Sequence, residues 1–255
     1  MSWNARTALL FGSEALEILS EANVLVVGLG GVGAMAAEQL ARANIGRMTI
    51  ADADVIEPSN INRQLPAMRS TIEQKKVDVM ASRLKDINPD LELTVLDEYL
   101  RDNRMIDVLN TQFDYVVDAI DTLAPKVYLI YHSIQKGYPV VCSMGSGGKT
   151  DPSQVFVTDI SRTHHCQLAR MVRKRLQKLG VKKGVRSVFS PEPVQKSAVI
   201  EEQGTNKASN VGTVSYMPAI FGCFLASEVI LGILKQFKIK KAPGENLGSL
   251  SDIAK

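Results

Sequence analysis

Short apolar runs alternate with stretches of helical periodicity over the first 145 residues of the chain. The runs predict buried strands at residues 23–28, 48–52, 91–96, 115–118 and 139–142. Between them, apolar residues at helical spacing predict helices at residues 13–21, 33–43, 71–87, 103–109 and 126–136. Ser13 is expected to cap the first of these helices. This alternation predicts an α/β fold with right-handed crossovers and a mainly parallel sheet covered by helices on both faces.

The remaining residues depart from this alternation. A further strand is predicted at residues 155–158, and the segment 162–210 is expected to be a basic helix followed by a mobile loop near Glu201. An apolar helix is then predicted at residues 215–234. We expect one domain over residues 1–255, in which the basic segment is a long excursion before the last helix.

The last apolar segment, residues 217–234, is the candidate for membrane contact. Glu228, Gly222 and Gly232 interrupt it, whereas a spanning helix needs about 20 apolar residues. We expect a buried or interface helix without stable membrane insertion, and a membrane-contacting helix is the alternative.

Composition and cysteine content are those of a soluble intracellular protein. The 255 residues are 45% hydrophobic and 22% charged, and the net charge is only +3. The three cysteines are Cys142, Cys166 and Cys223, an odd number at wide spacing that does not predict a disulfide framework. Because the N-terminus also lacks the pattern of a signal peptide, we expect a cytoplasmic protein.

A glycine-rich loop joins the first predicted strand to the helix after it. Gly28, Gly30, Gly31 and Gly33 would let the backbone approach a phosphate, and the start of the helix would offer free N–H groups. Asp52, at the end of the second strand, could accept hydrogen bonds from ribose hydroxyls. The loop predicts a nucleotide site, with NAD as the default ligand when this motif is considered alone. The alternative is a tight strand–helix turn that binds nothing.

The loop after the second strand is dense in polar side chains, which are Asp54, Asn60, Asn62, Arg63 and Gln64. Arg63 could bind phosphate oxygens through two hydrogen bonds, and Lys76 further along could act as a point charge. These cations suit a triphosphate better than NAD. Asp121 follows the fourth strand, and a carboxylate there suits Mg²⁺.

Together these motifs resemble the ubiquitin-activating-like adenylating superfamily, which includes the thiamine- and molybdopterin-biosynthesis adenylating enzymes and has a Rossmann-like fold. The resemblance covers about residues 5–160. It implies that a carboxylate attacks the α-phosphate of ATP and that pyrophosphate leaves. The nucleotide-binding residues carried over by position are Gly28, Gly30, Gly31, Gly33, Asp52, Asp54, Asn60, Asn62, Arg63, Gln64, Lys76 and Asp121. Asp52 would hold the ribose, and Asn60, Arg63 and Lys76 would stabilise the phosphates. Asp121 would hold Mg²⁺.

The resemblance also implies a homodimer in which an N-terminal arginine reaches the ATP of the partner subunit. Arg6 is the candidate here. The catalytic set is therefore expected to be Arg63, Lys76, Asp121 and Arg6. The alternative for each is a surface charge without measurable effect.

The cysteines limit which member of the superfamily this is. Sulfur-carrier adenylating enzymes commonly hold zinc with two Cys-x-x-Cys pairs, and this chain has none. The run His164-His165-Cys166 could offer metal ligands, or Cys166 a nucleophile, but an incidental cysteine is the simpler interpretation. Cys142 and Cys223 are expected in the core.

The second half of the chain resembles the tRNA threonylcarbamoyladenosine dehydratases. The similarity runs through 145–148, 151–152, 154–155, 158–160, 168–176 and 188–192. It implies adenylation of the threonylcarbamoyl carboxylate beside the anticodon, followed by attack from an internal nitrogen or oxygen and loss of AMP. No cysteine is needed, because the nucleophile belongs to the substrate. A sulfur-relay protein is retained as a candidate partner.

Basic residues dominate the segment 162–196, where Glu192 is the only acid. They are Arg162, Arg170, Arg173, Lys174, Arg175, Lys178, Lys182, Lys183, Arg186 and Lys196. Such a patch could bind tRNA phosphates. The alternative is a solvated helix face.

Three other functions remain open from the sequence. The first is adenylation of a ubiquitin-like sulfur-carrier protein. The second is an NAD-dependent oxidoreductase, which the cations at Arg63 and Lys76 argue against. The third is a non-catalytic scaffold that keeps the fold.

Overall fold

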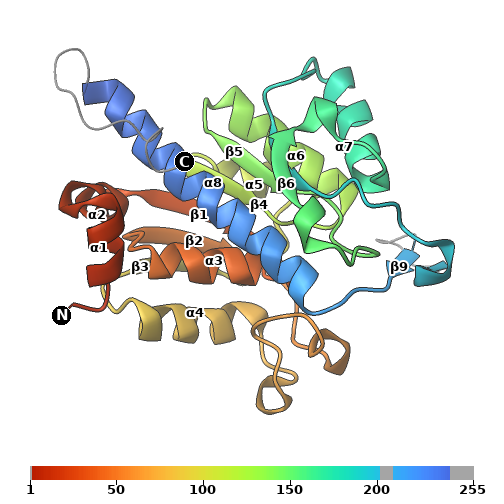
Figure 1. Cartoon of the computed structure of the whole chain (residues 1–255), viewed down its shortest axis with the longest axis horizontal. Helices are drawn as coiled ribbons and strands as arrows, with labels where there is room; N and C mark the ends of the chain where they lie inside the picture. The colour runs from red at the N-terminus through yellow and green to blue at the C-terminus, as the bar shows by residue number, and fades with distance from the viewer. Residues whose placement is uncertain (1, 202–208, 242–255) are drawn as a thin grey trace.

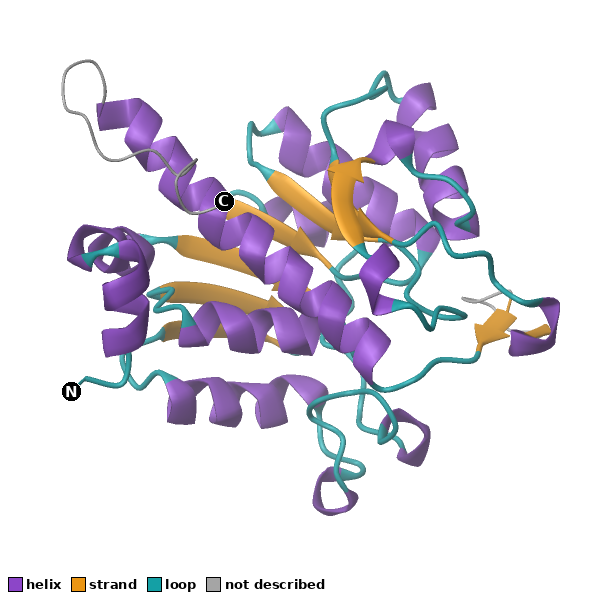
Figure 2. Ribbon diagram, in the orientation of Figure 1, coloured by secondary structure: helices purple, strands orange, loops and turns teal. Residues whose placement is uncertain are grey.

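A seven-stranded sheet with helices on both faces forms the body of the protein (Figures 1 and 2). The computed structural model describes residues 2–201 and 209–241. The strands are β1 (Asn23–Val27), β2 (Arg47–Ala51), β3 (Glu92–Leu96), β4 (Tyr115–Asp118), β5 (Val140–Ser143), β6 (Phe156–Asp159) and β7 (Arg186–Phe189). Their order is β3-β2-β1-β4-β5-β7-β6, and every neighbouring pair is parallel except β6 with β7. The Rossmann-like fold predicted from the sequence is confirmed.

The helices divide between two apolar cores, one on each face of the sheet. They are α1 (Ala5–Phe11), α2 (Ser13–Glu21), α3 (Gly33–Arg42), α4 (Lys76–Ile87), α5 (Asp102–Val108), α6 (Leu123–Gln135), α7 (Gln167–Lys178) and α8 (Tyr216–Lys241). Helices α2, α3, α4 and α8 bury apolar side chains in one core, and α5, α6 and α7 do so in the other. The central strands β1 and β4 are buried almost throughout, which explains their unbroken apolar sequence.

Helices α1, α2 and α4 each differ in one respect from the sequence prediction. Helix α1 was not predicted, and none of its side chains is buried. Helix α4 begins at Lys76 instead of residue 71, because the chain first forms a 3₁₀ turn at Arg69–Thr71 and reverses at Glu73, whose φ is 68°. Ser13 lies inside α2, where Gly12 is the N-cap and makes no side-chain cap bond.

The segment 162–210 contains a strand that the sequence did not reveal. Strand β7 inserts between β5 and β6 and is part of the main sheet, so this segment is more than a helix and a loop. A small hairpin of β8 (Val199–Glu201) and β9 (Ser209–Val211) follows. The loop predicted to be mobile falls largely on residues 202–208, which lie outside the described residues.

Judged by length and composition alone, the part of helix α8 at Tyr216–Phe237 could cross a membrane. Half of its most apolar window is buried inside the protein, and it crosses α3 in Figure 1. The two helices approach closely at Gly222, where an added Cβ would lie 2.5 Å from the Val32 carbonyl oxygen. The prediction of a packed helix is therefore confirmed in this respect, although Cys223, expected in the core, is exposed.

Candidate active site

The glycine loop lies between the end of β1 and the start of α3, at the carboxyl edge of the sheet. Gly28 has a φ of 91°, and an added Cβ there would meet the Ala119 carbonyl oxygen at 2.8 Å. An added Cβ at Gly33 would lie 1.8 Å from the Gly28 carbonyl oxygen. No side chain caps the N-terminus of α3. The glycine loop thus packs tightly against the backbone at Gly28 and Ala119. The N-terminus of α3 presents uncapped N–H groups where an anion could bind.

We predict opposite effects of alanine at two of these glycines. Gly33→Ala should destabilise the fold strongly, because backbone atoms block the Cβ. Gly30→Ala should fold normally, since only the Gln64 amide nitrogen comes within 4.0 Å of the added Cβ, yet it should weaken nucleotide binding by filling space needed for phosphate. Thermal melting and nucleotide titration of both variants check this, and equal melting temperatures for the two would contradict it.

Asp52 is fixed beside the glycine loop by backbone hydrogen bonds. Its Oδ2 accepts from the Leu29 N–H at 2.5 Å, and its Oδ1 accepts from the Asp54 N–H at 2.8 Å. Burial raises the pKa of the Asp52 carboxyl, and the nearby Lys76 ammonium partly opposes that shift. The carboxylate is therefore oriented before any ligand arrives.

Lys76 lies at the first position of α4 with its side chain almost completely buried. Its Nζ is 2.6 Å from Asp54 Oδ2, a carboxylate that is itself mostly exposed. The neighbouring Lys75 points away and pairs with Asp97 at the surface. The chain thus buries one of two adjacent lysines next to Asp52 and Asp54.

The polar loop after β2 packs on the glycine loop. Arg63 is half-buried, and its Nη1 donates to the Ser59 carbonyl at 2.8 Å and to Asn62 Oδ1 at 3.0 Å. Asn62 donates to the Thr213 carbonyl at 3.3 Å, just before α8. An added Cβ at Gly31 would lie 2.9 Å from the Arg63 carbonyl oxygen. The Arg63 backbone therefore lies next to the glycine loop, while its guanidinium donates within its own turn.

Two amides of this loop are buried. Asn60 accepts from the Glu57 N–H at 3.2 Å and holds the turn that carries Arg63. Gln64 is buried against the glycine loop, and its Oε1 has no hydrogen-bond partner. A buried acceptor without a donor is costly, so this atom is suited to accept from a bound group.

Asp118 and Lys126 form a completely buried ion pair beneath the site. Lys126 Nζ is 2.7 Å from Asp118 Oδ2 and donates to the Ile120 carbonyl at 2.9 Å. Burial raises the pKa of Asp118, and the Lys126 ammonium opposes the shift. The pair fixes the segment that ends at Asp121, an exposed residue at the same edge as Asp52.

The sequence did not single out Lys126. A lysine in an amphipathic helix is ordinarily expected to face solvent, and only its position after Asp118 in the next element signals a buried partner.

Arg6 is the one predicted catalytic residue that the chain does not bring to this edge. It is exposed on α1, which packs on α2. Asn4 donates to Asn44 at the far end of α3 from the glycine loop (Figure 1).

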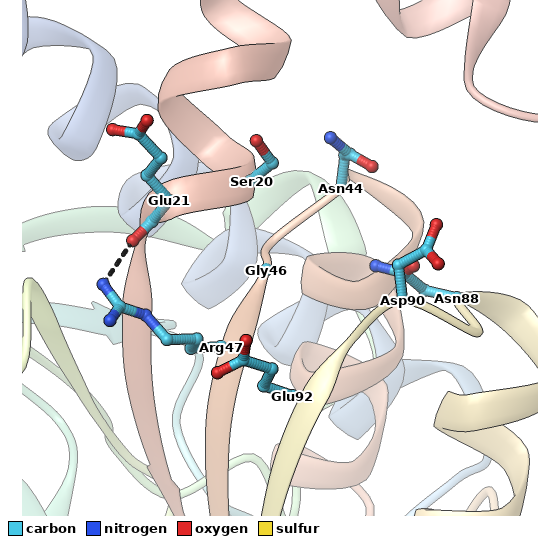
Figure 3. Close-up of a pocket in the computed structure, with 8 residues that line it drawn as sticks. All are labelled: Ser20, Glu21, Asn44, Gly46, Arg47, Asn88, Asp90 and Glu92. Carbon is cyan, nitrogen blue, oxygen red and sulfur yellow. Dashed lines mark hydrogen bonds between the residues drawn. The ribbon is translucent and has the colours of Figure 1, made fainter.

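Two other places in the structure gather polar or metal-binding side chains away from this edge. A polar cavity of about 400 Å³ lies at the opposite, amino edge of the sheet, where Arg47 donates to the Glu21 carbonyl at 2.7 Å (Figure 3). None of the residues that line this cavity belongs to the predicted nucleotide or catalytic site. At 164–166, Cys166 is buried and accepts from the Ala169 N–H at 3.5 Å. Within residues 2–201 and 209–241, no group of three or more metal-binding side chains is assembled.

The fold and this edge define a nucleotide-binding α/β protein with cations placed for phosphate. A family model described as the ThiF family matches residues 4–250, and the chain belongs to this family. It is 37% identical over 93% of its length to the tRNA threonylcarbamoyladenosine dehydratase of Bacillus subtilis, covering 96% of that protein.

Solved structures and more distant relatives agree with this placement. A crystal structure of the Escherichia coli tRNA N6-threonylcarbamoyladenosine dehydratase in complex with ATP superposes with a TM-score of 0.85 at 34% identity, covering 93% of this chain and 96% of that one. The Escherichia coli sulfur carrier protein ThiS adenylyltransferase is 32% identical, but only over 51% of this chain and 53% of that protein.

Proposed function

We propose that the protein is an ATP-dependent tRNA threonylcarbamoyladenosine dehydratase. It would join the threonylcarbamoyl carboxylate to AMP and then cyclise the product with net loss of water. The observation that carries the proposal is that Asp52 and the Arg63 backbone contact the glycine loop while Lys76 lies beside Asp52 and Asp54. The chain is also similar over almost its whole length to an ATP-bound dehydratase.

The geometry supports a role toward the nucleotide for each of these residues. Asp52 would accept from the ribose hydroxyls, and the N-terminus of α3 would face the phosphates. Arg63 and Lys76 would stabilise the negative charge that moves onto the leaving pyrophosphate. Because Lys76 is already paired with Asp54, the phosphates would replace that carboxylate as its partner. Gln64 Oε1 would take a donor from the bound nucleotide.

Mg²⁺ would bind through Asp121 and phosphate oxygens. The described residues do not assemble a closed cation site of their own. Mg²⁺ is commonly held by one or two carboxylates together with substrate phosphates and water, so a single carboxylate beside the nucleotide suits it. When bound, the ion would neutralise charge on the phosphates.

The two chemical steps balance without a protein nucleophile. A carboxylate oxygen of the threonylcarbamoyl group attacks the α-phosphorus, and the bond to pyrophosphate breaks. A nitrogen or oxygen of the same group then attacks the acyl carbon, loses its proton, and AMP leaves. Holding both groups in one molecule supplies a high effective concentration, so a buried Cys166 is no obstacle.

Helix α7 would contact the tRNA backbone. Its exposed cations are Arg170, Lys174, Arg175 and Lys178. Within the part of the chain that the structure describes, none of these four forms an ion pair. Uncompensated cations of this kind attract nucleic-acid phosphates by releasing counterions.

We predict that Arg170→Gln and Lys174→Gln each weaken tRNA binding and lower the slope of log affinity against log salt by about 1, as expected for one lost phosphate contact. ATP affinity should not change. Lys136→Gln, at the end of α6, is the matched control and should leave the slope intact. Filter binding at several salt concentrations measures these slopes, and unchanged slopes in both α7 variants would contradict the contact.

A homodimer would complete the site. Helix α1 buries no side chain, and Trp3, Leu9 and Leu10 leave about half or more of their surface exposed. A second copy would cover this face and bring its Arg6 to the ATP.

A sulfur-relay protein stays a candidate partner. A cytoplasmic location is supported by the free thiols of the described cysteines.

The pH dependence of ATP binding should report Asp52. Because burial raises its pKa, Asp52 takes up its proton at a higher pH than an ordinary aspartate as the solution is acidified. The protonated form is a poorer acceptor for ribose, so ATP affinity should fall with decreasing pH in the wild type more than in Asp52→Asn. Calorimetric titrations of both proteins across mildly acidic pH test this, and parallel profiles would disprove the role.

The competing function is adenylation of a sulfur-carrier protein. Product analysis separates the two: AMP and pyrophosphate should appear with ATP and threonylcarbamoyladenosine-containing tRNA, and not with unmodified tRNA. Formation of a carrier-protein adenylate instead would favour the alternative.

A further inference from the structure

Three aromatic rings meet where β6 begins and β7 ends. Phe189 is buried, and two exposed rings contact it: Phe156, with 41% of its surface exposed, and His164. The Phe156 and Phe189 ring centroids are 4.7 Å apart, and those of His164 and Phe189 are 5.5 Å apart. The buried ring thus supports two solvent-exposed ones, and we call Phe156 and His164 the aromatic platform.

The backbone holds this platform in place. Phe156 pairs with Phe189 in the antiparallel register of β6 and β7. Next to His164, His165 has a φ of 51° and its Nδ1 lies 3.1 Å from the Pro191 carbonyl oxygen. Phe156 is therefore fixed within the sheet, while His164 lies in the connection between the 3₁₀ turn Ile160–Arg162 and α7, where its Nδ1 is 3.2 Å from the Arg162 carbonyl oxygen.

The platform lies on the same edge of the sheet as the nucleotide site, several strands away. Asp118, Cys142 and Ser187 are in register across β4, β5 and β7. At about 4.8 Å between neighbouring strands, Phe156 on β6 is roughly 14 Å from the level of Ile120, which lies two residues after the end of β4. This distance places the platform outside the site where the carboxylate reacts, within reach of a neighbouring nucleotide of the same RNA.

The cations of α7 begin beside the platform. Arg173 donates to the Thr163 carbonyl at 2.8 Å and also contacts the Thr163 hydroxyl, which ties α7 to the residue before His164. Arg170, one turn earlier, and Lys174 are exposed without an ion pair among the described residues. Exposed aromatic rings next to uncompensated cations are the combination that binds single-stranded nucleic acid.

We propose that the aromatic platform stacks an unpaired base that flanks the modified nucleoside, while α7 binds the adjoining phosphates. The inference rests on the proposed function and adds how the RNA loop is distinguished from duplex RNA. A base in a duplex has both faces covered by its neighbours, whereas a loop base can leave the stack and lie on Phe156. The platform would therefore select the loop that carries the substrate.

The test uses the full-length protein with a fluorescent anticodon stem-loop RNA and a blunt RNA duplex of equal phosphate number. Phe156→Ala should weaken stem-loop binding about tenfold, the effect of losing one base–aromatic stack, and leave duplex binding unchanged. Its salt slope should equal that of the wild type, because no phosphate contact is lost. Phe156→Trp should keep wild-type affinity.

Two controls keep the result interpretable. Phe156→Leu retains apolar packing on Phe189 without an aromatic face. It should therefore melt at the temperature of the wild type, and its affinity for the stem-loop should be as low as that of Phe156→Ala. Val95→Ala removes a comparably exposed apolar side chain on β3, at the opposite end of the sheet from β6, and should change nothing in RNA binding. Wild-type affinity of Phe156→Leu for the stem-loop would overturn the platform while leaving the proposed function intact. A wild-type protein that binds neither RNA would instead refute tRNA as the substrate.

Discussion

Lys76→Ala should lower the rate of ATP-dependent dehydration by about 10²- to 10³-fold, the usual cost of removing one group that stabilises transition-state charge. Lys76 is the buried cation nearest Asp52 and Asp54, and the phosphates would take over its ion pair. Asp54 is mostly exposed, so losing its partner should cost little stability. Release of AMP from ATP with modified tRNA measures the effect.

The adjacent lysine provides the control. Lys75→Ala removes a cation from the same turn, but its side chain is directed to Asp97 at the surface. This variant should turn over like the wild type. Equal rates for Lys76→Ala and Lys75→Ala would mean that the buried lysine has no part in catalysis.

Lys126→Met should have the largest effect on stability, a loss of about 3–5 kcal/mol, because it leaves the Asp118 carboxylate buried without a counterion. Urea unfolding monitored by circular dichroism measures it. The double variant Asp118→Asn/Lys126→Met should recover most of the stability, since both charges are gone.

Activity should not recover to the same extent in the double variant. Lys126 also holds the Ile120 carbonyl, and methionine cannot replace that hydrogen bond next to Asp121. A double variant with full activity would show that the segment before Asp121 needs no such anchor. A single variant as stable as the wild type would show that the buried charge is tolerated.

Local patterns predicted most of the sheet. The strands β1 and β4 are buried on both faces and therefore appear as unbroken apolar runs. The glycine loop and Asp52 come together because β1 and β2 are adjacent in space as well as in sequence. In a parallel sheet, the ends of these two neighbouring strands lie at the same edge, which places Asp52 beside the glycine loop.

Non-local contacts account for what the sequence missed. Strand β7 follows a basic segment and pairs with β5, which lies far earlier in the chain, so no local signal identified it. Helical periodicity did not reveal the reversal at Glu73, which fixes the start of α4 and so the position of Lys76. The partner of Asp118 could not be chosen among several lysines without knowing which side of α6 faces the sheet.

The most direct test of the proposed function is mass spectrometry of nucleosides from threonylcarbamoyladenosine-containing tRNA after incubation with the protein and Mg-ATP. A dehydratase should convert the modified nucleoside to a product lighter by one water, and the conversion should require ATP and Lys76. An unchanged nucleoside, in a preparation that binds ATP, would contradict the tRNA substrate and direct attention to a carrier protein.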